Sequence, residues 1–144
     1  MDPHFAFNTA GGIAMLGWLG LLMSLFVPAT RDTARMAARL AIPALLGVAY
    51  VVLIAQGWGK APSGGFGSIE QVRALFSVDA ALSAGWLHYL AFDLFVGSWI
   101  VEDGLARGIN RFLLIPCLAL TFLFGPAGLL LFQGLRLILA RKST

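Results

Sequence analysis

Four long apolar stretches, separated by polar segments, dominate the hydrophobicity pattern of the chain. They cover about residues 9–29, 36–57, 84–101 and 112–132. Each is close to the roughly 20 residues that cross a bilayer as a helix. Inside lipid the backbone must satisfy its own hydrogen bonds, so each stretch is predicted to be helical. The pattern predicts an all-α polytopic membrane protein, with residues 1–144 forming one domain and its helices a four-transmembrane-helix bundle.

The connection between the second and third stretches, residues 58–82, is longer than the others and contains a helix-start signal. Ser68 followed by Gln71 fits a capping box. Ile69, Val72 and Phe76 then recur at helical spacing. We therefore predict a short interfacial helix lying on the membrane surface. A mobile loop is the alternative.

The composition excludes several classes of protein. Hydrophobic residues make up 59% of the chain and charged residues only 12%, which is too little polar material to cover a soluble fold of this size. The net charge of +3 comes from scattered basic residues, so no nucleic-acid partner is expected. The lone Cys117 and the two histidines, His4 and His88, cannot build a disulfide framework, a histidine-box di-iron site or a bis-histidine haem site within one chain. Any catalysis is expected to be acid–base, with no metal and no cofactor.

Basic residues near the spans bear on how the chain inserts. No basic region precedes the first stretch, so it is predicted to be a retained helix rather than a signal peptide. With no transit peptide either, we expect a multi-pass protein of a bacterial inner membrane. Arg31 and Arg35 in the first connection favour a cytoplasmic location for the first and third connections, with both termini outside. Lys60, Arg73, Arg141 and Lys142 favour the opposite orientation.

Asp93 is the one charged residue in the middle of a predicted span. A carboxylate there costs on the order of 3 kcal/mol on insertion scales, so it should face protein and have a polar partner. Tyr89 and Gly97 lie four residues before and after it, on the same helix face. Tyr89 is therefore a candidate hydrogen-bond partner. Asp93 is either a functional group or a purely structural contact between helices.

His88 lies five residues before Asp93, so the two side chains point roughly 140° apart around the helix. It shares a face with Phe92, Phe95 and Trp99, and that face ends near Glu102. His88 is either part of a site or a satisfied polar anchor near the interface. Glu102 is either a further site residue or a solvated residue at a helix end.

Two segments carry a family resemblance. Residues 85–97 contain His-Tyr-Leu-Ala-Phe-Asp, and residues 120–130 contain Phe-Gly-Pro. Together with Phe-Gly-Ser-Ile-Glu at 66–70, these motifs are similar to the signature of the ABA4-like (abscisic acid-deficient 4-like) family, over roughly residues 8–135. Plant members are chloroplast membrane proteins required to make neoxanthin from violaxanthin. That conversion is an isomerisation in which an epoxide opens and an allene forms, with no net redox change.

The resemblance implies a cofactor-independent isomerase acting on a carotenoid or related isoprenoid. An acid must act on the epoxide oxygen and a base must remove a proton from the polyene. Asp93 and His88 are the expected pair, in either order, with Tyr89 and Glu102 as further catalytic candidates. The expected polyene groove is lined by Phe92, Phe95, Trp99, Phe122 and Phe124. The alternative is a non-catalytic protein that binds or scaffolds a polyene, quinone or lipid. Expected partners are membrane lipid, and a second copy of the chain or a pathway enzyme.

Overall fold

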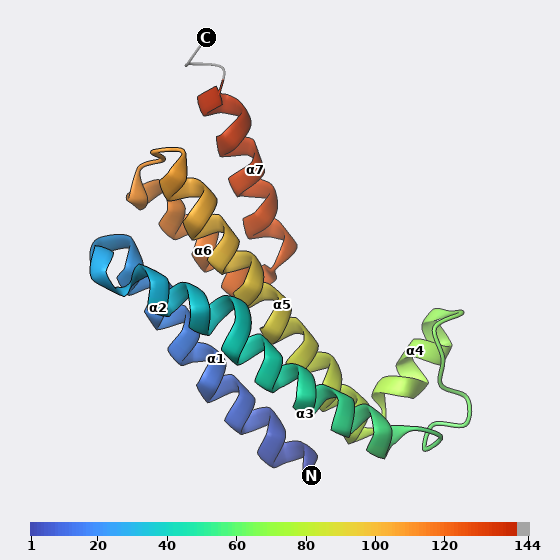
Figure 1. Cartoon of the computed structure of the whole chain (residues 1–144). Coiled ribbons are helices and arrows are strands. Elements are labelled where there is room, and N and C mark those ends of the chain that lie inside the picture. The colour runs from blue at the N-terminus through green and yellow to red at the C-terminus, as the bar shows by residue number, and fades with distance from the viewer. Residues whose placement is uncertain (141–144) are drawn as a thin grey trace.

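The computed structural model describes residues 1–140, and helices account for most of them (Figure 1). In chain order the elements are α1 (Pro3–Phe26), the 3-10 turn η1 (Pro28–Thr30), α2 (Arg31–Met36), the π-helical turn η2 (Ala37–Ala41), α3 (Ile42–Gly57), α4 (Ile69–Phe76), α5 (Asp79–Ala106), α6 (Arg111–Phe124) and α7 (Pro126–Ala140). No strand occurs among these described residues. The predicted all-α class is confirmed.

Three helical segments are long and apolar enough to cross a membrane: Pro3–Phe26, Pro28–Gly57 and Asp79–Ala106. They correspond to the first three predicted spans. α5 packs against both α1 and α3, and small residues allow close contact. Gly97 of α5 faces the ring of Trp18, and Gly17 of α1 faces Leu94, so a Cβ at either glycine would lie under 3.0 Å from the facing side chain.

The predicted fourth span, residues 112–132, is wrong as a single helix. α6 ends at Phe124 and α7 begins at Pro126, and Figure 1 shows the two side by side and antiparallel, as a helical hairpin. At 14 and 15 residues, they are only about 21 and 22 Å long, too short to cross a hydrocarbon core of about 30 Å. Gly125 makes the reversal with φ +41°, a conformation that favours glycine. The four-helix bundle is therefore corrected to three spanning segments and one hairpin.

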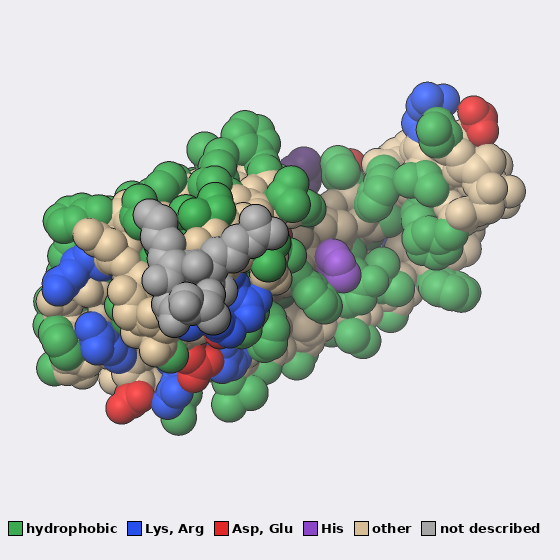
Figure 2. All heavy atoms as spheres, turned by 90° about the horizontal axis from the view of Figure 1, so that it is seen from above, with side chains coloured by type: hydrophobic (Ala, Val, Ile, Leu, Met, Phe, Trp, Pro, Cys, Tyr) green, Lys and Arg blue, Asp and Glu red, His purple; other side chains and the backbone are tan. Residues whose placement is uncertain are grey.

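The reversal sends the termini to opposite ends of the molecule. The N-terminus lies where α3 ends and α5 begins, and His4 is 3.8 Å from Asp79 there, whereas α7 ends at the opposite end of the molecule, where the first and third connections lie (Figure 1). We call this second end the basic end. Its basic side chains are Arg31, Arg35, Arg39, Arg107, Arg111 and Arg136. Figure 2 looks onto it and shows charged side chains gathered there, while the flanks are mostly hydrophobic. Arg141 and Lys142 lie outside the described residues.

The connection between α3 and α5 contains the predicted short helix. The Ser68 hydroxyl caps α4 by accepting a hydrogen bond from the Gln71 amide at 3.3 Å. The Gln71 side chain in turn accepts one from the Gly67 amide at 2.9 Å. Phe66 and Ile69 are 87% and 72% exposed, so apolar surface is available on this segment for contact with lipid.

Candidate functional site

Asp93 lies at the middle of α5 and directly against the turn of the α6–α7 hairpin. A Cβ on Gly125 would lie 2.7 and 2.9 Å from the two Asp93 carboxylate oxygens. The Oδ2 atom is buried and has no hydrogen-bond partner among the described residues. As its cost in lipid requires, the carboxyl group faces protein. Only glycine leaves room for it on the turn.

Tyr89 connects the same region of α5 to the hairpin. Its hydroxyl donates a hydrogen bond to the Phe122 carbonyl at 2.8 Å. In a continuous helix that carbonyl would accept from the amide four residues later, but this residue is Pro126, which has no N–H. Tyr89 therefore satisfies a carbonyl that would otherwise be unpaired inside the membrane. The phenolic proton is thereby donated to the hairpin, one turn of α5 before Asp93.

His88 lies on a different face of α5, in a groove of 610 Å³ between α3 and α5. Its ring stacks on Phe92 at a centroid distance of 4.5 Å and lies 6.0 Å from the ring of Tyr50. Phe95 also lines the groove, and the lining is almost entirely apolar. His88 and Asp93 thus face different sides, consistent with their spacing. Sequence reasoning missed Tyr50, although it is the one tyrosine of the second predicted span.

The structure does not bring the other predicted groove aromatics to this place. Trp99 packs edge-on against Phe132 of α7, with ring centroids 5.3 Å apart. Phe122 packs edge-on against Trp18 at 5.6 Å, in a separate groove between α1 and α6. Phe124 is 63% exposed at the end of α6. The expectation that all five aromatics line one groove is therefore wrong for Trp99, Phe122 and Phe124. Trp99 lies on the side of α5 that packs against α7, and Phe122 and Phe124 belong to the hairpin itself.

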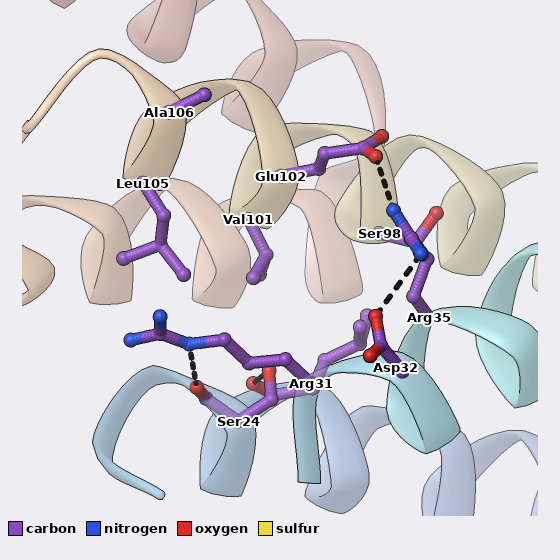
Figure 3. Close-up of a pocket in the computed structure, with 10 residues that line it drawn as sticks. Ser24, Arg31, Asp32, Arg35, Ser98, Val101, Glu102, Leu105 and Ala106 are labelled. Atoms are coloured by element: carbon purple, nitrogen blue, oxygen red, sulfur yellow. Dashed lines mark hydrogen bonds and ion pairs between the residues drawn. The ribbon is translucent and has the colours of Figure 1, made fainter. Parts of the chain in front are cut away.

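Glu102 belongs to an ion-pair cluster at the basic end. Its carboxylate oxygens lie 2.8 Å from a guanidinium nitrogen of Arg35 and 2.5 Å from one of Arg39, and Figure 3 shows Arg35 reaching between Glu102 and Asp32. Arg39 sits in η2, where the helical ladder widens just before Pro43, a residue that cannot donate to the Arg39 carbonyl. Glu102 lies nine residues after Asp93 on α5, which is about 13.5 Å along the helix axis, and it lies farther still from His88. Glu102 is therefore placed away from both Asp93 and His88.

A second acidic residue, Asp103, joins the hairpin to α5 at the same end. Its carboxylate lies 2.7 Å from the Arg107 guanidinium and 3.1 Å from that of Arg136 in α7. Arg136 also lies over the Trp99 ring at 5.3 Å. Within residues 1–140 no group of three or more His, Cys, Asp or Glu side chains could hold a metal ion.

The hairpin is thus held at two points, by Asp93 and Tyr89 at its turn and by Asp103 at its open end. The groove holding His88 and Tyr50 lies on another side of α5, and its wall is shared with α3. The geometry therefore offers two neighbouring sites rather than one: a polar contact buried against the hairpin turn, and an apolar groove with two polar aromatic rings.

Comparison with known proteins identifies the relatives of this chain. A sequence model of the ABA DEFICIENT 4-like family matches residues 5–132. The matched region runs from α1 into α7 and includes His88, Asp93 and Gly125. Neither the curated proteins nor the solved structures contain a match. The match covers most of the chain and agrees with the resemblance of residues 85–97 and 120–130, and we conclude that this membrane protein belongs to the ABA DEFICIENT 4-like family.

Proposed function

We propose that the protein is a cofactor-independent isomerase that acts on a carotenoid or related isoprenoid within the membrane. One observation carries the proposal: an exposed imidazole, His88, stands in an otherwise apolar groove of 610 Å³ beside a phenol, Tyr50. A polar ring on the outside of a membrane helix is unfavourable unless it serves a purpose. A long polyene would fill the apolar lining, and the two rings would meet its reactive end.

The chemistry needs one acid and one base. Opening an epoxide to an allene breaks a C–O bond and a C–H bond, and forms an O–H bond and a C=C bond. The base takes the proton from carbon, the acid gives one to oxygen, and no electrons enter or leave. In the groove His88 is the proposed base and the Tyr50 hydroxyl the proposed donor to the oxygen.

Asp93 is assigned a different part in this proposal than the sequence alone suggested. Its carboxyl group faces the hairpin turn rather than the groove. It would act by holding the hairpin against α5, with Tyr89 beside it. Direct proton transfer by Asp93 would require the substrate to enter between α5 and the hairpin.

Expression in a host that accumulates violaxanthin tests the proposal, with pigments separated by chromatography and identified by mass spectrometry. We expect an isomer of unchanged mass in cells with the wild-type protein. His88→Ala should lower its formation by about 10²-fold or more, the usual range for losing an acid–base group. Tyr50→Phe should also lower it. His4→Ala is the matched control, because it removes the other histidine, and should leave turnover unchanged.

The alternative is a binding protein without catalysis, favoured by the position of Asp93 away from the groove. Purified protein that carries bound polyene of unaltered structure would support that alternative. An unchanged pigment profile with well-inserted wild-type protein would contradict the isomerase, as would full turnover by His88→Ala.

A further inference from the structure

A polar pocket, separate from the apolar His88 groove, lies at the basic end between the first and third connections. It has a volume of 610 Å³ and is lined by Phe26, Arg31, Leu105, Gly108, Ile109, Asn110, Arg111 and Phe112. Among residues 1–140, no acidic side chain lines it. It lies at the opposite end of α5 from α4, and about 20 Å along the helix axis from the level of Asp93.

The two arginines of this pocket differ from their neighbours. Arg35, Arg39, Arg107 and Arg136 each pair with a carboxylate of Asp32, Glu102 or Asp103. Arg31 and Arg111 have no acidic partner within 4.0 Å among residues 1–140. The nearby acids Glu102 and Asp103 already form ion pairs with those other arginines. The pocket therefore presents two guanidinium groups whose charge the described protein does not neutralise.

The guanidinium groups of Arg31 and Arg111 make only weak contacts within the protein. Arg31 donates one hydrogen bond through Nε to the Ser24 carbonyl at 3.3 Å, and Figure 3 shows it reaching along α1, away from Glu102. Arg111 lies over the ring of Phe26 at 5.8 Å. Arginine presents five N–H donors and suits the oxygens of a phosphate. Most of the donors of both side chains are free for a ligand.

The surroundings indicate what kind of anion fits. Phe26 and Phe112 line the same pocket, pack edge to face at 5.8 Å and are 41% and 65% exposed. An occupant with a charged head and an apolar body would match both the arginines and these rings. Basic pockets between transmembrane helices at the cytoplasmic surface bind anionic lipid headgroups in this way.

We propose that this pocket binds the phosphate of an anionic phospholipid, with Arg31 and Arg111 on the headgroup and the acyl chains over Phe26 and Phe112. The site is separate from the His88 groove and does not depend on the isomerase proposal. It would fix the basic end at the cytoplasmic surface and brace the connection that leads into the hairpin.

Native mass spectrometry of the detergent-purified protein tests this site. Phosphatidylglycerol is titrated against phosphatidylcholine of the same acyl chains and against inorganic phosphate. We expect one tightly bound phosphatidylglycerol. Arg31→Gln and Arg111→Gln should each weaken it about five-fold, and the double variant about 30-fold, since each basic side chain near a lipid surface contributes about 1 kcal/mol.

Control variants separate charge from folding. Arg31→Lys and Arg111→Lys keep the charge and should bind within a few-fold of wild type. Arg73→Gln removes an exposed arginine at the other end, in α4, and should leave binding unchanged. Equal affinity for the two lipids, or undiminished binding by the double glutamine variant, would overturn the proposal. Inorganic phosphate that displaces the lipid at equal concentration would assign the pocket to a free anion instead.

Discussion

The contact between Asp93 and the hairpin turn makes a quantitative prediction about Gly125. Replacing this glycine by alanine adds one methyl group that is unfavourable for two reasons: the backbone conformation and the contact with Asp93. The backbone has φ +41° and ψ −91°, and a Cβ would stand 2.7 Å from one Asp93 oxygen and 2.9 Å from the other. Both conflicts are absent in the wild type.

The two effects can be given separate magnitudes. Holding a residue other than glycine in such a backbone conformation costs of order 1–3 kcal/mol. Forcing one carbon into a filled site costs about 1–3 kcal/mol more. Gly125→Ala should therefore destabilise the fold by about 2–6 kcal/mol. If Asp93 is first replaced by alanine, the second effect disappears, and Gly125→Ala should cost only the backbone strain.

A double-mutant cycle measures this difference. The four proteins are purified in mild detergent and unfolded with increasing dodecyl sulfate, followed by circular dichroism. We expect a coupling free energy of about 1–3 kcal/mol between positions 93 and 125. Gly12→Ala, at an exposed glycine of α1 with nothing within 4 Å of the added carbon, is the control and should stay within about 1 kcal/mol of wild type. Additive effects at 93 and 125 would refute the contact.

Other contacts make simpler predictions. Gly97→Ala puts a methyl 2.6 Å from the Trp18 ring and should lower stability by about 1–3 kcal/mol in the same assay. Glu102→Gln removes the shared partner of two arginines and should cost about 1 kcal/mol, less at high salt, because the cluster is part-exposed. In α4, the carboxylate of Glu70 accepts hydrogen bonds from the Glu70 backbone amide and the Ser68 hydroxyl, and these hold the pKa of Glu70 below its usual value. This stabilisation of α4 is therefore present above the ordinary carboxyl range and is lost as pH falls through the lowered pKa. Hydrogen exchange of the α4 amides, corrected for intrinsic rates, should become faster over this pH range. In the Glu70→Gln variant this pH dependence should be absent.

Local chemistry was sufficient to predict much of the fold. Continuous apolar runs identified the three crossing segments, and the Ser68 capping signal identified α4. The five-residue spacing of His88 and Asp93 placed them on different faces of one helix, as the structure has them. The cost of a carboxylate in lipid implied that Asp93 faces protein. Each of these inferences depends only on neighbours in the chain.

The hairpin could not be predicted in the same way. Hydropathy runs without a break through residues 112–132, and Phe-Gly-Pro is compatible with a kink as well as a reversal. The outcome depends on whether α7 can pack against α6. Gly128 permits this, because it lies against Thr121 and the backbone of Cys117 with no room for a Cβ. That information lies in the tertiary contact.

The membership of the groove was unpredictable for a related reason. Tyr50 lies beside His88 because α3 packs against α5. Which helices neighbour α5 cannot be predicted from the local sequence pattern. Phe122 and Phe124 were expected in the groove as parts of a straight fourth helix. Once the chain reverses at Gly125, they lie on another side of α5.

The chain turns back at Gly125 beside Asp93 instead of crossing the membrane a fourth time. The most direct measurement is the location of both termini, with a compartment-sensitive reporter fused before Met1 in one protein and after Thr144 in another. Three crossings and a hairpin place the two reporters on opposite sides, with the C-terminal one in the cytoplasm beside the basic end. Reporters on the same side would require an even number of crossings and would contradict the hairpin.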